Sequence, residues 1–376
     1  MIDFQKLPSP CFVLDEQLLD RNLAVIDRVR RESGAEVIVA LKACAMWSIF
    51  PELAQHSDGA TASSLAEARL VFEEFGRPAH TYAPVYTDRN IEEILDCSDH
   101  ITFNSVAQFE RFGQMALLRG ISCGLRINPG YSPVETDLYN PCVPGSRLGI
   151  PPEQLKELPA GVEGLHFHVL CESGPEHLER ALEAVERNFG RFLDRIAWLN
   201  MGGGHLMTRE GYDCDRLVAV LRAFRERHPG LRLILEPGSA FTWRTGFLVS
   251  TVEDVVENGG VRTAMLDVSF ACHMPDCLEM PYKPAILGAR DPEPGEKGWR
   301  MGGNSCLAGD YYGDWIFDRD LRVGDRIVFE DMIHYTMVKT TMFNGVAHPA
   351  IAIVRRDGAI EIIREFGYED FKSRMS

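Results

Sequence analysis

The chain has 376 residues, of which 45% are hydrophobic, and its 55 acidic and 39 basic residues give a formal net charge of -16. This length is enough for one large hydrophobic core together with a smaller one. The excess of acidic residues argues against nucleic-acid or anionic-membrane partners, because proteins bind these through basic patches. The negative charge suits a cationic small-molecule ligand. The alternative is that the charge only keeps the surface soluble.

The N-terminal segment MIDFQKLPSP lacks the basic stretch and apolar run of a secretion signal. No stretch of the sequence approaches the ~20 apolar residues that a spanning helix needs. The 10 cysteines include no CxxC pair and show no regular metal-ligand spacing. We therefore expect a cytoplasmic protein with reduced thiols and no metal site.

Short apolar or β-branched runs recur through the first two-thirds of the chain and alternate with helical patterns. The predicted strands are 36–41, 59–62, 80–83, 101–104, 124–128, 164–169, 197–201 and 231–236. The clearest helical patterns are 65–75, 107–118, 175–192 and 216–227. This alternation of strand and helix predicts a (β/α)8 TIM barrel within the α/β class.

After about residue 245 the pattern changes to β-rich segments separated by Gly, Pro and Asp turns. These segments are 247–256, 262–268, 326–329, 336–341 and 351–354. The first strand-like run, 10–14, precedes the first barrel helix, so we expect it to pair with this second domain. The predicted division is a barrel over 15–245 and a β-barrel or β-sandwich domain formed by 1–14 plus 246–376.

The carboxyl ends of barrel strands are where this architecture places catalytic groups. Here those ends are unusually rich in reactive and polar residues. They carry Lys42, Asn104, Arg126, Asn128, His166, His168, the Gly202–Gly204 run and Glu236. This distribution favours an enzyme.

Lys42 ends the apolar run VIVALKACA. Burying its ammonium is costly unless the amine is neutral or bonded, which makes it a candidate for covalent attachment of a carbonyl compound. The alternative is a lysine whose charged end extends from a strand end into solvent.

Three consecutive glycines in LNMGGGH directly follow a predicted strand. They remove every Cβ and allow backbone N–H groups to approach an anion such as phosphate, although a tight turn explains them as well. Glu236, in LEPGS, can keep a pyridine nitrogen protonated and make the ring an electron sink. A salt bridge inside the barrel is the alternative.

His168 can lie flat against an aromatic cofactor, whereas His166, two residues earlier on the same strand face, is interpreted as a packed core residue. Cys306 lies in GGNSCLAGD close to Asp310, among small residues that suit a reactive or substrate-facing thiol. The alternative for any single cysteine is a buried, inert thiol.

Six ordered motifs resemble the fold-type III pyridoxal-phosphate-dependent decarboxylases, which include ornithine, arginine and diaminopimelate decarboxylases. They are LKA at 41–43, HV at 168–169, GGG at 202–204, EPG at 236–238, GGNSC at 302–306 and HYT with FNG between 334 and 345. The segment 266–284 and the ending FGYEDFKSRMS resemble the branch of that group that acts on carboxynorspermidine and carboxyspermidine. The resemblance implies an alanine racemase-like fold and a carboxy-lyase that forms norspermidine and spermidine in polyamine biosynthesis.

The resemblance also implies roles for individual residues. Lys42 binds pyridoxal 5'-phosphate covalently, Glu236 pairs with the pyridine nitrogen, and Cys306 or a water near it returns a proton. The other implied cofactor contacts are His168, Gly203, Gly204, Gly238 and Tyr335. A head-to-tail homodimer is implied, in which Cys306 reaches the neighbouring subunit's cofactor.

The distal amines of a cationic polyamine need acceptors, and we expect a slot near the dimer interface that supplies them. The candidate substrate contacts are Glu236, Ser239, His273, Asp276, Glu279 and Asp310. For Asp276 a loop-capping role is the alternative. The chain departs from related decarboxylases at Leu170 and Cys171, which replace a Gly-Ser pair, and at Ser239, which replaces an arginine that contacts phosphate.

Three other functions stay open. An amino acid racemase shares the barrel and the lysine, but an arginine at the pyridine nitrogen serves that chemistry better than Glu236. A decarboxylase of ornithine or meso-diaminopimelate is the second substrate hypothesis. A non-catalytic relative that binds a partner protein is expected to have lost Lys42 or Cys306, and both are present.

Overall fold

The computed structural model describes residues 2–279 and 281–376, so Met280, within the segment 266–284 used above, lies outside the described residues. The chain divides into two units: a barrel unit, Asn22–Phe241, and a sheet unit, formed by the residues up to Arg21 together with Thr242–Ser376. Two helices, α1 (Glu16–Ser33) and α8 (Ser239–Thr242), cross this division. The limits 15–245 and 1–14 plus 246–376 therefore stay a proposal.

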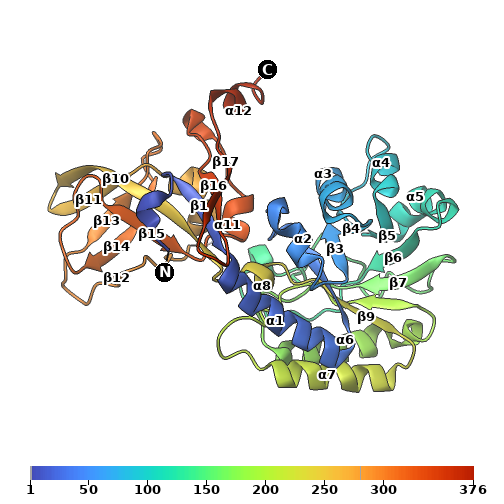
Figure 1. Cartoon of the computed structure of the whole chain (residues 1–376). Coiled ribbons are helices and arrows are strands. Elements are labelled where there is room, and N and C mark those ends of the chain that lie inside the picture. The colour runs from blue at the N-terminus through green and yellow to red at the C-terminus, as the bar shows by residue number, and fades with distance from the viewer. Residues whose placement is uncertain (1, 280) are drawn as a thin grey trace. The chain divides into compact units, whose positions relative to one another are not determined.

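The barrel unit contains a closed barrel of parallel strands in chain order, which confirms the predicted (β/α)8 architecture (Figure 1). The strands are β2 (Glu36–Ala40), β3 (Gly59–Ala62), β4 (Ala79–Tyr82), β5 (Ser98–Phe103), β6 (Ser122–Arg126), β7 (Val162–His166), β8 (Trp198–Asn200) and β9 (Arg232–Leu235). The helices after α1 are α2 (Phe50–Leu53), α3 (Leu65–Leu70), α4 (Ile91–Asp96), α5 (Val106–Leu118), α6 (Pro175–Leu193) and α7 (Cys214–Arg227).

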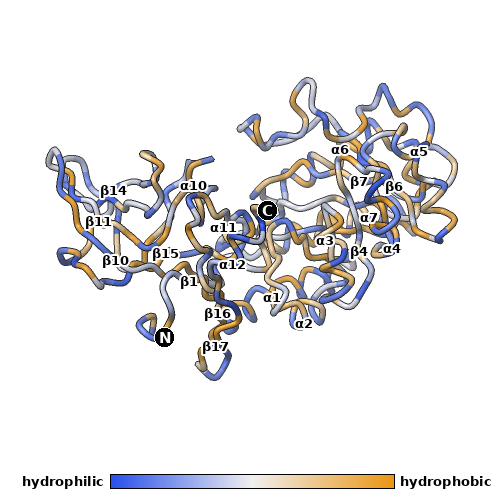
Figure 2. The backbone as a smooth tube through the Cα atoms, turned by 90° about the horizontal axis from the view of Figure 1, so that it is seen from above, coloured by the Kyte–Doolittle hydropathy of each residue, from blue (hydrophilic) through white to orange (hydrophobic). Residues whose placement is uncertain are grey.

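Helix α6 shows why these segments form an outer layer. Pro175 opens the helix, where its missing N–H costs nothing. Buried residues then recur every three or four positions, as at Leu178, Leu182, Val185 and Phe189, and form one apolar face. Each such side chain contributes about 1.5–3 kcal/mol when it leaves water. Figure 2 shows the resulting alternation of apolar and polar stretches along the backbone.

Trp198 on β8 fills part of the barrel interior and is almost completely buried. Its ring occupies space that small residues on the neighbouring strands leave open. A Cβ at Gly124 would lie 2.2 Å from the ring, and one at Gly164 would lie 2.0 Å from it. The two glycines on β6 and β7 are therefore required by packing rather than by backbone conformation.

The sheet unit is built on one mixed sheet of nine strands. The strand order is β12-β14-β13-β11-β10-β1-β16-β17, with β15 also paired to β10. The strands are β1 (Cys11–Asp15), β10 (Gly246–Asn258), β11 (Val261–Leu266), β12 (Ala289–Arg290), β13 (Trp299–Gly302), β14 (Tyr311–Phe317), β15 (Arg326–Glu330), β16 (Ala350–Val354) and β17 (Ile360–Arg364). Its helices are α9 (Phe270–His273), α10 (Pro275–Glu279), α11 (Tyr335–Val338) and α12 (Tyr368–Lys372).

Strand β1 pairs antiparallel with β10 and parallel with β16. This confirms the expectation that the run 10–14 joins the second domain. The predicted strand at 336–341 is wrong, because α11 forms there as one helical turn and buries Thr336. Its β-branched threonines suggested a strand, but tertiary contacts outweigh that weak preference. Strands β12, β13, β14 and β17 were not predicted.

No helix in the described part of the chain is both long and apolar enough to cross a membrane.

Candidate active site

Polar side chains from several barrel strands converge on one pocket at the carboxyl ends of those strands. Lys42 lies two residues after β2, His168 lies two residues after β7, and Glu236 directly follows β9. With Tyr82 and Arg126 they line a cavity of about 170 Å³. The structure thus brings together the barrel residues that the sequence singled out for their positions at strand ends.

The amine of Lys42 lies 3.1 Å from His168 Nε2. On the other side of the imidazole, the Gly203 N–H donates to His168 Nδ1 over 2.9 Å. Since Nδ1 is an acceptor, a neutral ring carries its proton on Nε2, where it donates to an unprotonated Lys42 amine. The glycine loop therefore fixes the histidine tautomer that faces the lysine.

Both titratable groups of this pair are shifted toward their neutral forms. Burial lowers the pKa of Lys42 from 10.5, and Glu236 opposes this shift while Arg126 adds to it. Burial also lowers the pKa of His168 well below 6.5, with help from the charges of Lys42 and Arg126. A neutral lysine amine is a nucleophile, as covalent attachment of an aldehyde requires.

Glu236 is buried and held by its neighbours. Asn200 Nδ2 donates to Glu236 Oε1 over 2.6 Å, and His166 Nε2 lies 3.7 Å from Glu236 Oε2. Burial raises the pKa of Glu236 above 4.5, although the Asn200 hydrogen bond and the charge of Lys42 counteract part of the rise. A carboxyl group of this kind is suited to sharing a proton with a basic ring nitrogen.

The Gly202–Gly204 loop requires glycine on two grounds. Gly202 and Gly204 have φ of 68° and 91°, values that L side chains rarely adopt. A Cβ at Gly203 would lie 2.4 Å from the Glu236 carbonyl oxygen, and one at Gly204 would lie 2.2 Å from the Leu170 carbonyl oxygen. The loop is thus a cradle that any side chain would fill.

Arg126 and Tyr82 were not given roles by the sequence. The Arg126 guanidinium is buried, lies 4.7 Å above the Tyr82 ring and donates to the His168 carbonyl oxygen over 3.2 Å. Arg147 also lines the pocket. Two arginines in the pocket of an acidic chain offer positive charge to a phosphate or carboxylate.

His166 is buried, as expected, but it also borders the pocket. Its ring meets the Tyr82 ring edge to face at 5.3 Å, and burial holds its pKa well below 6.5. It therefore contributes a neutral, polar wall beside Glu236. Asn104, another strand-end residue, accepts a hydrogen bond from the Tyr82 hydroxyl over 2.9 Å and holds that ring in place.

Gly238 and Ser239 lie just beyond Glu236. A Cβ at Gly238 would lie 2.6 Å from Ala43 Cβ, so this glycine allows the chain to pass close to the residue that follows Lys42. Ser239 begins the short helix α8 and is only partly buried.

In the sheet unit, Cys306 lies in the loop between β13 and β14 and is exposed. Its backbone N–H donates to Asn344 Oδ1 over 2.8 Å, which joins this loop to the FNG segment. Asp310 is buried and accepts from the backbone N–H groups of Ala271 and Ser305 over 3.0 Å each. Asp310 therefore shapes the Cys306 loop. Tyr335 opens α11.

His273 is fully buried in the sheet unit. Its Nδ1 accepts from the Ser269 N–H over 3.2 Å, and its Nε2 donates to the Ala347 carbonyl oxygen over 3.1 Å. Burial lowers the pKa of His273 to about 4. Both ring nitrogens are therefore engaged inside the unit, so in this conformation neither is available to a substrate amine.

Asp276 and Glu279 lie on α10 and share one cation. Lys339 Nζ pairs with the Asp276 carboxylate and lies 2.7 Å from Glu279 Oε2. The structure thus shows that these two acids attract an ammonium group, although the group is an internal lysine. The sequence offered no signal of this pair, because Lys339 is far away along the chain.

Residues 11–333 match the family model described as pyridoxal-dependent decarboxylase, C-terminal sheet domain. The chain is 55% identical to carboxyaminopropylagmatine decarboxylase of Synechocystis sp., over 98% of this chain and 96% of that protein. It is 39% identical to carboxynorspermidine/carboxyspermidine decarboxylase of Campylobacter jejuni, over 99% of both chains.

Among solved structures, the crystal structure of carboxynorspermidine decarboxylase complexed with norspermidine from Campylobacter jejuni is similar in fold and sequence. The TM-score is 0.90 at 37% sequence identity, and the match covers 98% of this chain and 100% of that chain.

Proposed function

The chain belongs to the pyridoxal-dependent decarboxylase family, and from this membership we propose that it removes the α-carboxylate of a carboxylated polyamine as carbon dioxide. The family resemblance of its six ordered motifs is thereby confirmed. The observation that carries the proposal is the pocket in which the Lys42 amine, the His168 imidazole and the Glu236 carboxyl group meet. Glutamate rather than arginine in this position favours decarboxylation over racemisation.

The residues of the pocket fit pyridoxal 5'-phosphate. The glycine loop is a cradle that a Cβ would fill, and Lys42 is a nucleophilic amine whose pKa burial lowers. We assign covalent attachment to Lys42, the ring nitrogen to Glu236, a ring contact to His168, and the phosphate to Gly203 and Gly204. Further cofactor contacts are proposed for Gly238 and for Tyr335 of the sheet unit.

When bound, this cofactor accepts the electron pair of the breaking bond between Cα and the carboxylate. The chain's residues position the groups around that bond. Glu236, fixed by Asn200, holds a proton for the ring nitrogen. His168 orients the Lys42 amine, and Arg126 brings positive charge to the pocket. Cys306 is the proposed proton donor to the carbon that loses the carboxylate.

The substrate proposal rests on the named relatives, whose substrates share one chemical feature. Each is a polyamine that carries an α-amino acid group at one end. Two relatives are decarboxylases of carboxynorspermidine and carboxyspermidine, and a solved structure of one such enzyme holds norspermidine. Carboxynorspermidine and carboxyspermidine, which would yield norspermidine and spermidine, are therefore the proposed substrates.

A second candidate substrate is carboxyaminopropylagmatine, which ends in a guanidine instead of a primary amine. The observation that favours it is the 55% identity to the Synechocystis enzyme named for that substrate. Both candidates are cations, so both suit the chain's net charge of -16.

The acids on α10 support recognition of the distal cation. Asp276 and Glu279 already hold the Lys339 ammonium, so their local chemistry accepts an amine or guanidine. Glu236 and Ser239 are proposed to contact the reacting end. His273 and Asp310 are proposed to act by holding α9 and the Cys306 loop, since their polar atoms bond within the sheet unit.

We propose that the enzyme is a head-to-tail homodimer in which Cys306 of one subunit completes the site of the other. Support comes from the exposed surface around this thiol. Leu307 and Phe343, beside the joined Cys306 and Asn344, are about half exposed, at 47% and 50%. Exposed apolar side chains beside a functional cysteine are typical of a surface that another chain covers. A cytoplasmic location is part of the proposal, since all 10 cysteines are free thiols.

Mixing two inactive variants tests the shared site. Lys42→Ala and Cys306→Ser subunits are unfolded and refolded together, or coexpressed. If each site combines the two residues from different subunits, random pairing restores about a quarter of the wild-type sites. Activity that stays at the level of the separate variants contradicts the shared site.

The decarboxylase assignment is tested by the visible spectrum and by carbon dioxide release. The purified protein is expected to show an absorption band of bound cofactor that disappears in Lys42→Ala and persists in Lys156→Ala, a matched change at an exposed lysine. The assay compares carboxynorspermidine, carboxyspermidine, carboxyaminopropylagmatine, ornithine and meso-diaminopimelate. Turnover of ornithine or meso-diaminopimelate alone contradicts the polyamine proposal, and absence of the band contradicts the cofactor site.

A further inference from the structure

The end of the barrel where the strands begin, opposite the pocket, carries a separate group of polar side chains. His80 is the second residue of β4 and His100 is the third residue of β5. The two are direct cross-strand partners in the parallel pair. Their rings stack with centroids 3.9 Å apart and planes inclined by 23°. We call His80, Asp99 and His100 the floor cluster.

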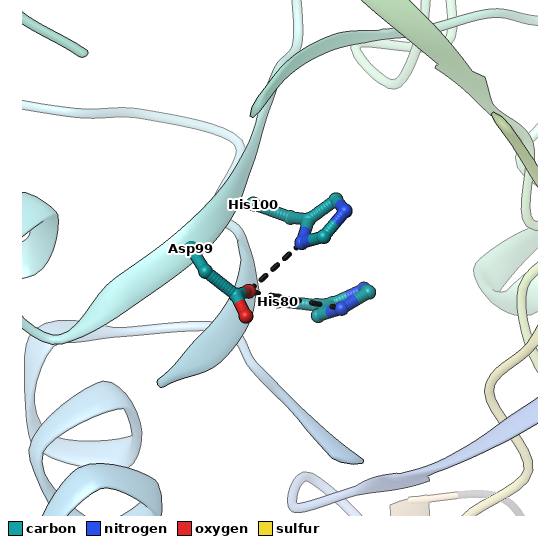
Figure 3. A group of neighbouring side chains, drawn as sticks. All are labelled: His80, Asp99 and His100. Carbon is teal, nitrogen blue, oxygen red and sulfur yellow. Dashed lines mark hydrogen bonds and ion pairs between the residues drawn. The ribbon is translucent and has the colours of Figure 1, made fainter. Parts of the chain in front are cut away.

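A β-bulge brings the third member of the floor cluster into place. Ala79 pairs with Ser98 and His80 pairs with His100, so Asp99 is an extra residue on β5 without a partner on β4. A bulge of this kind redirects a side chain that regular alternation would point to the other face. Figure 3 shows the Asp99 carboxylate turned toward both imidazole rings.

The separations of the donor atoms match a metal ion. Asp99 Oδ1 lies 2.8 Å from His100 Nδ1 and 3.8 Å from His80 Nε2. One ligand atom from each of the three residues lies within 4.8 Å of the others. A tetrahedral zinc ion with bonds of about 2.0–2.1 Å separates its ligand atoms by about 3.3 Å, a value between the two observed distances.

The floor cluster is also accessible to a metal ion. His100 Nδ1, the ring nitrogen that faces Asp99, is in hydrogen-bond contact with Asp99 Oδ1 at 2.8 Å, and an ion would take the place of that hydrogen bond. The Asp99 side chain is 49% exposed and gives an ion a path from solvent.

The surroundings of the floor cluster include one competing cation. Arg232 lies close enough to oppose positive charge at His80, but its guanidinium is paired with Glu36 through contacts of 2.7 and 2.9 Å. Trp198 packs its edge against the His100 ring at 5.6 Å and gives the cluster an apolar wall. The Glu36 carboxylate therefore offsets the local positive charge next to the cluster.

We propose that His80, Asp99 and His100 bind one divalent transition-metal ion, with zinc as the best match, at the floor of the barrel. Two imidazoles and a carboxylate are ligands that Zn²⁺ and its first-row neighbours accept, and water completes the coordination. The ion would join the beginnings of β4 and β5 and stabilise the barrel. The site is independent of the proposed function, because its ligands lie at the opposite end of the barrel from Lys42. The spacing of cysteines in the sequence gave no sign of it, since the ligands come from two strands and a bulge.

Metal titration of the holoenzyme tests the proposal. The protein is first dialysed against a chelator and then titrated with Zn²⁺ by calorimetry and with Co²⁺ by its visible spectrum. We expect one ion per chain, and a Co²⁺ spectrum without the intense sulfur charge-transfer bands of a thiolate site. His80→Gln, His100→Gln and Asp99→Asn should each weaken binding by more than about tenfold.

His56→Gln is the matched control. His56 Nδ1 lies 2.7 Å from Asp27 Oδ2, and His56 Nε2 lies 3.7 Å from Glu52 Oε1, so this histidine has carboxylate neighbours but no second imidazole. Its variant should bind zinc like the wild type. X-ray absorption of the zinc-loaded wild type, which needs no variant, should show imidazole ligands and no sulfur. The proposal is overturned if the wild type binds no zinc, if zinc is bound through sulfur, or if the three floor variants bind as tightly as His56→Gln.

Discussion

The Asn200 side chain links the buried acid of the pocket to the glycine loop. Its Nδ2 donates to Glu236 Oε1 over 2.6 Å, while its Oδ1 accepts from the Gly202 N–H over 2.9 Å. One amide therefore positions both the residue assigned to the ring nitrogen and the loop assigned to the phosphate. It is a positioning residue, since its own contacts are to the protein.

Replacing Asn200 by alanine should weaken cofactor binding and decarboxylation together. The change removes the Asn200 hydrogen bonds to the buried Gly202 N–H and to Glu236 Oε1, at a cost of about 1–3 kcal/mol. This corresponds to a loss of about 10–100-fold in cofactor affinity or kcat/KM. The measurements are cofactor titration by absorbance and steady-state kinetics.

Asn188→Ala is the control for Asn200→Ala, because Asn188 Nδ2 donates to the Pro129 carbonyl oxygen over 2.9 Å and has no contact with Glu236. Equal losses in both variants would show that the effect is general destabilisation.

The pH dependence of cofactor capture should follow Lys42. A lysine whose folded-state pKa is lowered becomes neutral at lower pH than a free lysine, so the midpoint of cofactor capture against pH should lie below 10.5. Glu236→Gln removes a negative charge near Lys42 and should move the midpoint of cofactor capture to still lower pH. Removing the positive charge of Arg126 with Arg126→Gln should move it up.

Absorbance of the bound cofactor after mixing with cofactor-free protein, measured across pH, gives these midpoints. A wild-type midpoint near 10.5, or equal midpoints in the two variants, would contradict the assignment of burial as the cause.

At the scale of residues, the sequence was sufficient to predict that Lys42, His168 and Glu236 lie at the carboxyl ends of barrel strands, because each follows a strand that was itself predictable. Asn200 and Tyr82 meet the same criterion of position at a strand end and were missed. The partnership of Lys339 with Asp276 and Glu279 was not predictable, since it depends on where α10 and α11 pack.

At the scale of elements, the Gly202–Gly204 loop allows the cost of a backbone conformation to be separated from the cost of a steric clash. Gly204→Ala puts a Cβ 2.2 Å from the Leu170 carbonyl oxygen at φ of 91°. The conformation alone costs about 1–2 kcal/mol, and the clash adds about 1–3 kcal/mol. We expect a lower free energy of unfolding and a cofactor affinity reduced more than tenfold, as about 1.4 kcal/mol would produce.

Gly211→Ala isolates the conformational effect. Gly211 has φ of 78°, with nothing within 4 Å of the added Cβ. Urea unfolding and cofactor titration of both variants give the comparison. If Gly211→Ala lowers cofactor affinity as much as Gly204→Ala, the clash with the Leu170 carbonyl oxygen is not the reason that the loop requires glycine.

The elements themselves were predicted with uneven success, for physical reasons. The barrel strands and long helices have local periodic patterns that sequence reveals, as α6 shows. The run 336–341 was misjudged because its fold as α11 depends on burial of Thr336, which is a tertiary effect. The bulge at Asp99 was also invisible, since it exists only in the pairing of β4 with β5.

At the scale of the whole molecule, the net charge of -16 should influence substrate capture. A cationic polyamine is attracted to an acidic protein, and salt screens this attraction. We expect KM to rise about threefold between low and high salt while kcat stays constant. Steady-state kinetics across a salt series provide the test. A neutral osmolyte, which changes viscosity without changing ionic strength, is the control. An unchanged KM would assign the charge to solubility alone.

The pairing of β1 has a consequence for the order in which the chain acquires its structure. Cys11 is synthesised before every barrel strand, yet it pairs with Val249 and Ala350, which follow the barrel in the chain. The barrel strands β2 to β9 all emerge before either partner exists, and apart from the closing pair of β2 with β9 each barrel strand pairs with its neighbour in the chain. Strand β1 must therefore remain unpaired while the barrel strands are made, so the sheet unit is completed last during synthesis. Pulsed hydrogen exchange during refolding should accordingly protect the amides of β2 to β9 before those of β1.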